Sequence, residues 1–225
     1  HSQIVCDSGE FAVLRDYPQI LCKRTVHRYY AYMADVPESI RLDATALKVL
    51  AHPLRARLLG ALRHRGRATA TELAADLETN SGATSYHLRR LEEVALVRDT
   101  GEGAGRRRLW EPTTQYHSYH PSDFADDDDA EAALGWLTRD YVRHLATRQE
   151  RWIDVQATWP LEWRDAAGLS DDMVVVTAEQ MRALADELNE VIRRYRRVGQ
   201  GNPQARRVTV FFGAHPIDMG QAPRR

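Results

Sequence analysis

The sequence "NSGATSYHLRRLEEVALV", residues 80–97, decides the fold together with "RDTGEGAGRRRLWEP", residues 98–112. Asparagine favours the N-cap of a helix, so a helix is predicted to begin after Asn80. Its inward side repeats at i, i+4 and i+7: Thr84, Leu88 and Leu91. Its outward side is small, aromatic or cationic: Gly82, Tyr86, Arg89 and Arg90. A helix that only packs in a core needs no such face, which suits contact with an anion.

A β-hairpin is predicted directly after this helix. Leu96 and Val97 precede, and Leu109 and Trp110 follow, a loop that is rich in glycine, which is the pattern of two short strands joined by a turn. The loop ends in three consecutive cationic side chains: Arg106, Arg107 and Arg108. The hairpin therefore presents positive charge next to the polar face of the helix.

Shorter helices are predicted upstream. Apolar residues recur at helical spacing over 42–50, and His52-Pro53 interrupts them because the residue before proline leaves the helical region. Pro53 suits the first turn of a second helix that Gly66 closes. Thr69 and Glu72 have capping-box spacing and open a third helix. Helices in this order, followed by a basic hairpin, predict a winged helix-turn-helix, in a chain that is mainly α with a small β component.

The charge of the chain is unevenly distributed. Residues 41–112 contain 13 Lys plus Arg against 9 Asp plus Glu, a net of +4, whereas residues 113–225 contain 14 against 18, a net of −4. A basic segment beside an acidic one indicates a module that binds a polyanion, joined to a region with another task. The longest apolar runs are too short to cross a bilayer, so no membrane span is predicted.

Residues 47–97, "LKVLAHPLRARLLGALRHRGRATATELAADLETNSGATSYHLRRLEEVALV", resemble the DNA-binding domain of ArsR-type winged-helix repressors. The resemblance rests on "HPLR-x-x-LL" at 52–59, "T-x-x-ELA" at 69–74 and "S-x-HL-x-x-L" from Ser85 to Leu91. Ala95 stands where the family usually has glycine. The resemblance covers about residues 42–112 and implies a homodimeric regulator, expected to be a repressor, that binds an inverted repeat in double-stranded DNA.

The second helix of such a pair lies in the major groove, so DNA-contacting residues are predicted on it. Contacts to base edges are expected from Ser81, Ser85, Tyr86 and Arg89. Contacts to phosphates, or a partly structural role, are expected from Asn80, Thr84, His87 and Arg90. His87 borders the buried stripe, so a structural role remains an alternative for it. Arg106, Arg107 and Arg108 would reach the DNA backbone or the minor groove.

Two other interpretations stay open. In the first, the helix after Asn80 and the basic loop do not bind DNA and are only a solvated amphipathic helix beside a charged turn. In the second, the winged helix mediates protein contacts in a small-molecule-binding or enzyme-like protein. The sequence contains no HExxH motif, nucleophile elbow or phosphate-binding loop, so no enzymatic activity and no cofactor are predicted. His117, His120 and Asp123 lie at metal-ligand spacing, but solvated linker histidines are the preferred interpretation and no metal is predicted.

Four regions are predicted. Residues 1–40 are expected to be a tag, leader or flexible extension, with Met33 as a natural start, and they hold both cysteines, Cys6 and Cys22. Residues 41–115 form the DNA-binding domain and 116–129 an acidic linker. Residues 130–225 form a helical dimerisation or effector region, with strands at "MVVV" and "RRVTVFF".

The last region is predicted to hold a helix over about 131–159 and a second one that Thr177 and Gln180 cap. Dimerisation is expected through two apolar stripes, Leu42, Leu47 and Leu50 at one end and Met181, Leu184, Leu188, Val191 and Tyr195 at the other. Four tryptophans would form dimer core or, alternatively, an aromatic pocket for a small-molecule effector: Trp136, Trp152, Trp159 and Trp163.

Overall fold

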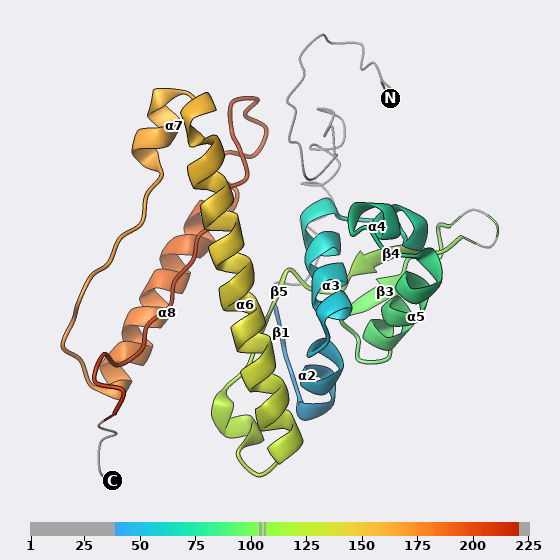
Figure 1. Cartoon of the computed structure of the whole chain (residues 1–225), viewed down its shortest axis with the longest axis horizontal. Helices are drawn as coiled ribbons and strands as arrows, with labels where there is room; N and C mark the ends of the chain where they lie inside the picture. The colour runs from blue at the N-terminus through green and yellow to red at the C-terminus, as the bar shows by residue number, and fades with distance from the viewer. Residues whose placement is uncertain (1–38, 104, 106, 221–225) are drawn as a thin grey trace. The chain divides into compact units, whose positions relative to one another are not determined.

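A computed structural model of the chain describes residues 39–103, 105 and 107–220. It divides the chain into two compact units, one that ends at His144 and one that begins at Leu145 (Figure 1). The predictions for Met33, Cys6 and Cys22 lie outside the described residues, as does the one for Arg106.

The first unit opens with two helices whose ends follow the sequence signals. Helix α2, Ala44–Leu50, begins where the Asp43 carboxylate accepts a hydrogen bond from the Ala46 amide at 2.7 Å. Helix α3, Pro53–Arg65, has His52 at its N-cap and proline in its first turn. Gly66 ends it with φ at +88°, a conformation that favours glycine. The predicted ends of both helices are therefore confirmed.

Two further helices form the helix-turn-helix. Helix α4, Ala70–Asp76, carries the predicted capping box between Thr69 and Glu72. Helix α5, Ser81–Glu92, begins at Asn80, whose side chain accepts a hydrogen bond from the Ala83 amide at 2.7 Å. After α5, Ala95 has φ at +55°, a conformation that favours glycine, the residue that the resemblance implies at this position.

A three-stranded sheet completes the winged helix. Strand β3, Val97–Asp99, and strand β4, Leu109–Pro112, are antiparallel, with Asp99 opposite Trp110. Strand β2, Ala68–Thr69, pairs with the other side of β4. The loop between β3 and β4, residues 100–108, is called the wing from here on. The predicted hairpin is confirmed, and so is the mainly helical fold with few strands.

The core of the first unit lies between these helices and β4. Thr84, Leu88 and Leu91 of α5 are all fully buried, together with Trp110 of β4. Burial of leucine side chains of this kind contributes about 1.5–3 kcal/mol each to folding. Glu111 is also buried, and its carboxylate binds Arg67 at 2.7 Å and Arg98 at 2.6 Å. The buried stripe packs α5 into this core, and the ion pairs of Glu111 join β4 to Arg67 and to β3.

The predicted linker at 116–129 is wrong, because this segment is folded onto the first unit. Strand β5, Tyr116–Ser118, pairs in parallel with β1, Ser39–Arg41. A 3-10 helix, η1, Pro121–Phe124, follows, and Phe124 is buried in the core. The acidic residues are paired: Asp123 binds Arg41 at 2.6 Å and Asp127 binds Lys48 at 2.8 Å. Burial of the Phe124 ring holds the segment in place.

The acidic run then begins a long helix. Helix α6 spans Asp128–Val155 and runs from the first unit into the second. Its acidic first turn suits the positive end of the helix dipole. The sequence pattern had predicted this helix over about 131–159, so its start and end are each displaced by a few residues.

In the second unit, η2, Gln156–Thr158, and α7, Leu161–Ala166, follow α6. Helix α8, Ala178–Tyr195, has the predicted cap between Thr177 and Gln180. The strands predicted at 173–176 and 206–212 are wrong. Both segments are extended, but neither pairs with another strand in the described part of the chain. A strand needs a hydrogen-bonding neighbour, and residues 39–220, as far as they are described, provide none for these segments.

Candidate nucleic-acid interface

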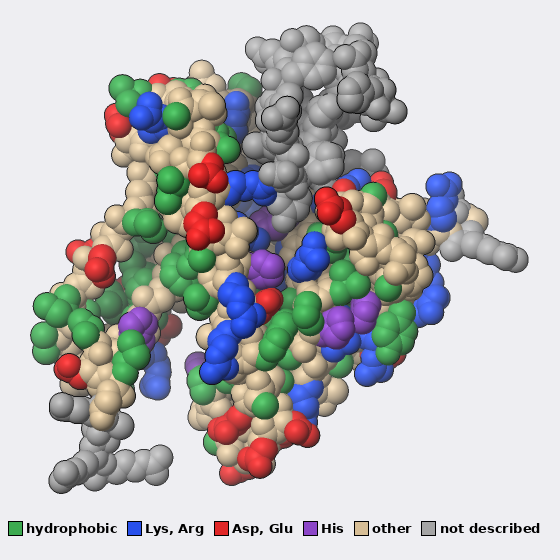
Figure 2. Space-filling model, viewed as in Figure 1, with side chains coloured by type: hydrophobic (Ala, Val, Ile, Leu, Met, Phe, Trp, Pro, Cys, Tyr) green, Lys and Arg blue, Asp and Glu red, His purple; other side chains and the backbone are tan. Residues whose placement is uncertain are grey.

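Helix α5 presents the polar face that the sequence predicts. Tyr86 is 55% exposed, and Ser81 and Arg89 are also exposed, whereas Ser85 is half-buried. Arg89 makes no ion pair with any residue that the structure describes. Its guanidinium therefore remains available for an external acceptor, and basic side chains gather over α5 and along the wing (Figure 2).

The prediction that Thr84 contacts DNA is wrong. It has no exposed surface, and its hydroxyl donates to the Asn80 carbonyl at 3.0 Å within α5. A Thr hydroxyl readily bonds to a carbonyl one helical turn earlier, so this polar side chain is satisfied internally. Asn80 itself caps α5, although it is exposed. Arg90 is half-buried and pairs with Glu93 one turn further along.

The wing carries its arginines on a short, anchored loop. Arg67 of the first unit binds Glu102 in the wing at 2.6 Å and Glu111 in β4 at 2.7 Å. Arg107 and Arg108 are exposed. Arg108 lies 3.3 Å from Asp99 and 3.6 Å from Glu92, and its guanidinium is 5.7 Å from the Trp110 ring centroid. Glu102 of the wing is thus held by Arg67, and Arg108 lies beside the C-terminal end of α5.

Two residues beside α5 were missed as interface candidates. His52 at the N-cap of α3 lies with its ring centroid 4.5 Å from that of His87. Arg55 lies in the first turn of α3. Burial is the largest cause that lowers the pKa of both histidines, and the positive charge of Arg55 is a smaller one. The "HPLR" motif at 52–55 contains both residues, but the sequence gives no sign that they meet α5.

The prediction that Leu42, Leu47 and Leu50 form part of a dimer interface is wrong. Leu42, Leu47 and Leu50 are all at most 2% exposed. They belong to the core of their own chain, where α2 packs against α3 and α5. An apolar stripe that is already covered cannot bind a second subunit without opening the domain. The predicted residues on α8 are half-buried or exposed, with Tyr195 at 70%.

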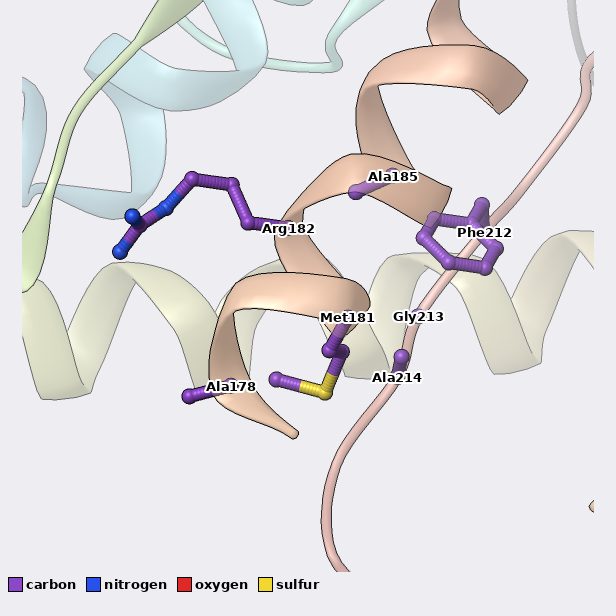
Figure 3. A pocket seen from close by; sticks show the side chains of 7 residues that line it. All are labelled: Ala178, Met181, Arg182, Ala185, Phe212, Gly213 and Ala214. Carbon is purple, nitrogen blue, oxygen red and sulfur yellow. The ribbon is translucent and has the colours of Figure 1, made fainter. Parts of the chain in front are cut away.

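The four tryptophans do not form one pocket. Trp136 packs against the core of the first unit. In the second unit, Trp159 lies edge-on to Trp152 at 5.4 Å and to Trp163 at 5.8 Å. A separate concavity beside α8 is lined by Ala178, Met181, Arg182, Ala185, Phe212, Gly213 and Ala214 (Figure 3). Phe212 lies against the helix there, while Arg182 extends away from the ring.

His117, His120 and Asp123 are not gathered around a metal position. Both ring nitrogens of His117 are bonded, Nδ1 to Arg63 at 2.8 Å and Nε2 to the Tyr141 hydroxyl at 2.5 Å. Burial, and then the Arg63 charge, lower the pKa of His117 to about 3. Asp123 is bound by Arg41. Among the described residues, no three His, Cys, Asp or Glu side chains are placed to hold a metal ion.

One membrane-related finding is negative. Within residues 39–220, apart from 104 and 106, no helix combines the length and the apolar character that a membrane span requires.

Comparison with known proteins finds a family match for one segment of the first unit. Residues 50–100 match the family model of a helix-turn-helix domain. Among solved structures, reduced HlyU from Vibrio cholerae is 22% identical with a TM-score of 0.29, covering 43% of this chain and 85% of its own. An apo double mutant of ZitR from Lactococcus lactis is 14% identical with a TM-score of 0.27, covering 63% and 80%. A further structure of that mutant is 16% identical with a TM-score of 0.26, covering 69% and 77%. No curated protein matches.

The family match spans α3, α4, α5 and β3, which are the elements that build the polar face of α5. It agrees with the caps, the hairpin and the motifs at 52–59, 69–74 and 85–91. Residues 50–100 therefore match a helix-turn-helix domain, and the elements from α2 to β4 have the arrangement of a winged helix-turn-helix.

Proposed function

We propose that the protein is a homodimeric repressor that binds an inverted-repeat operator, with α5 of each subunit in a major groove. The observation that carries this proposal is the division of α5 into a fully buried stripe and an exposed face with Tyr86 and Arg89. A major groove admits one α-helix and offers acceptors on guanine that match arginine. The wing beside α5 would meet the adjacent phosphates.

The proposed contacts divide into two groups. Ser81, Ser85, Tyr86 and Arg89 would contact base edges. Asn80, His87 and Arg90 would contact phosphates, together with Arg106, Arg107 and Arg108 in the wing. Thr84 is left out because its buried hydroxyl is already bonded. We assign no catalytic activity, cofactor or metal, and we place the protein on the nucleoid in the cytoplasm.

The dimer follows from the small contact that one winged helix makes. Two modules related by a two-fold axis match a palindromic site and double the recognition surface. Because Leu42, Leu47 and Leu50 are buried in the first unit, α8 is the candidate dimerisation surface. Its apolar stripe repeats at near-heptad spacing and contains no buried residue. The second unit would also hold any effector site.

The experiment that tests the function is genome-wide mapping of the native protein on DNA, followed by affinity measurements on the recovered sites. We expect an inverted repeat bound with a dissociation constant on the order of 10⁻⁸ M and a strong salt dependence. If no genomic site is enriched and no duplex binds specifically, the winged helix serves protein contacts instead, and the small-molecule or enzyme-like alternative is favoured.

Replacement of Arg89 by alanine should change the base preference at one position of each half-site. Loss of a bidentate contact to guanine weakens binding by roughly 1–3 kcal/mol for the preferred base and relaxes the choice there. Selection of bound duplexes from a randomised pool measures this directly. Arg193→Ala, on α8, is the matched control and should keep the wild-type preference. An unaltered preference in Arg89→Ala would remove α5 from the base contacts.

Replacement of both Arg107 and Arg108 by alanine should weaken binding to every sequence alike. Each lost phosphate contact lowers the slope of log K against log salt by about one unit. A titration by fluorescence anisotropy at several salt concentrations gives this slope. Because Arg108 also adjoins Asp99 and Glu92, the Arg107→Ala single variant separates the two contributions. An unchanged slope in the double variant would contradict a wing that touches the backbone.

A further inference from the structure

The N-terminus of α3 and the middle of α5 bring three basic side chains together at one edge of the recognition helix. The rings of His52 and His87 are tilted by 37° with centroids 4.5 Å apart. Tyr86 lies edge-on to His87 at 5.1 Å, and the charge of Arg55 acts on both histidines. In Figure 2, histidine side chains reach the surface beside Lys and Arg side chains near α5.

The hydrogen bonds fix how the two rings present their protons. The Leu54 amide donates to Nδ1 of His52 at 3.2 Å. In its neutral form His52 therefore carries its proton on Nε2, as a donor. Nδ1 of His87 is buried and has no hydrogen-bond partner in the part of the chain that the structure describes. The His87 ring is thus incompletely satisfied in the free protein, which is unusual for a buried polar atom.

The groups whose charges lower the pKa of His52 and of His87 are cationic. His87 is acted on by His52 and Arg55, and Arg55 by Arg90 and the Tyr86 hydroxyl. Arg55 is held in place because its Nε donates to the Val49 carbonyl. On the other elements packed against α5, Lys48 of α2 pairs with Asp127, and Asp76 of α4 pairs with Arg65. In the described residues, Arg55 makes no ion pair with a carboxylate. On α5 itself, Arg90 pairs with Glu93, so Arg55 is the arginine of this edge that is available to an external anion.

We propose that His52, Arg55 and His87 form a site for one backbone phosphate of the operator, and that filling the site adds a proton to the histidine pair. This inference rests on the proposed function, which places α5 in the major groove. A phosphate on the flank of that groove would accept from Nε2 of His52 and from the Arg55 guanidinium. Its negative charge would favour the doubly protonated form of the neighbouring ring.

The expected consequence is proton-linked DNA binding. In the free protein, burial first and then the adjacent positive charges lower the pKa of His52 and of His87. A bound phosphate opposes this and raises the pKa of the pair in the complex. Affinity gained in this way is fully present below the pKa of the free protein and is lost as the pH rises through the pKa of the complex. Between these two values, each subunit changes the affinity by up to about tenfold per pH unit.

The test uses the full chain and an operator duplex recovered by selection. Anisotropy titrations at pH 8.0, 7.0 and 6.0 and fixed ionic strength give the pH slope, and calorimetry in two buffers of different ionisation enthalpy counts the protons taken up. We expect wild-type affinity to rise about tenfold or more from pH 8.0 to 6.0. His87→Gln and His52→Gln should bind somewhat more weakly than the wild type at pH 8.0, and both should lose most of the rise toward pH 6.0. His120→Gln, at an exposed position, should keep it.

Arg55→Met provides the second measurement, because it retains the apolar stem and removes the charge. It should reduce the salt slope by about one unit per subunit, and circular dichroism should show an intact domain. Specific binding by the wild type with no pH slope and no proton uptake would overturn this inference and leave the regulator function standing. A slope that survives in both histidine variants would also overturn it. Absence of specific binding at every pH would instead reject the proposed function.

Discussion

A Leu188→Glu variant should sediment as a monomer at micromolar concentration and should bind the full operator about a thousandfold more weakly than the wild type. Leu188 lies in the middle of α8, on the stripe that also holds Leu184 and Val191. If α8 pairs with its twin, a carboxylate at this position would be buried without a partner. A monomer binds only one half-site, and a thousandfold loss corresponds to about 4 kcal/mol.

The matched control is Glu187→Gln, one position away, at an exposed residue whose change adds no charge. It should remain a dimer with wild-type affinity. Leu188→Glu should keep the far-ultraviolet circular dichroism of the folded domain, because α2 to β4 belong to the other unit. A wild-type monomer at micromolar concentration, or a Leu188→Glu dimer with undiminished affinity, would contradict dimerisation through α8.

The elements that the sequence predicted correctly are those determined by local interactions. The caps at Thr69 and Asn80 act over three residues, and a helix end marked by Gly66 needs no distant partner. The hairpin is similarly local, with its two strands joined by the wing. Periodicity then sufficed to assign Leu88 and Leu91 to the core.

The errors concern interactions between distant segments. Nothing near Phe124 in the sequence shows that its ring enters the core of the first unit, so its acidic surroundings suggested a linker. The apolar stripe of Leu42, Leu47 and Leu50 indicated burial correctly, but periodicity does not tell whether the same chain or a second one covers it. For the same reason, the β-forming residues at 173–176 and 206–212 did not reveal that no described strand pairs with them.

Part of the candidate site was also beyond the sequence. The exposed side of α5 followed from helical spacing, including Tyr86 and Arg89. The approach of His52 to His87 depends on how α3 crosses α5, which no local pattern specifies. Thr84 has the residue type of a DNA contact, and only its packing shows that its hydroxyl is used within the helix.

The second large effect concerns His117, a half-buried residue whose hydrogen bonds join three elements of the first unit. Arg63 of α3 donates to the Thr114 carbonyl at 3.0 Å and to its hydroxyl at 3.2 Å, and it also contacts Nδ1 of His117. Because arginine only donates, Nδ1 must accept. The proton of the neutral ring then sits on Nε2 and is donated to the Tyr141 hydroxyl of α6.

Protonation of His117 should therefore destabilise the fold. It would place an N–H against the Arg63 guanidinium, and burial together with that charge lowers the pKa of His117 to about 3 from 6.5. The unfolded chain binds this proton more readily, so the stability conferred by the neutral ring is complete above pH 6.5 and is lost as the pH falls toward 3. The loss is about 1.4 kcal/mol per pH unit inside this window, or about 2 kcal/mol between pH 6.5 and 5.

Chemical denaturation at pH 7.0 and 5.0, followed by far-ultraviolet circular dichroism, measures the effect on the full chain. His117→Gln should be less stable at pH 7.0 but should lose about 2 kcal/mol less than the wild type on acidification. His120→Gln is the matched control, because His120 is only three residues away and exposed. It should follow the wild type at both pH values. Other groups titrate equally in all three proteins, so the difference between variants isolates one ring. Equal acid sensitivity of His117→Gln and the wild type would show that the network of Arg63, His117 and Tyr141 does not hold the ring neutral.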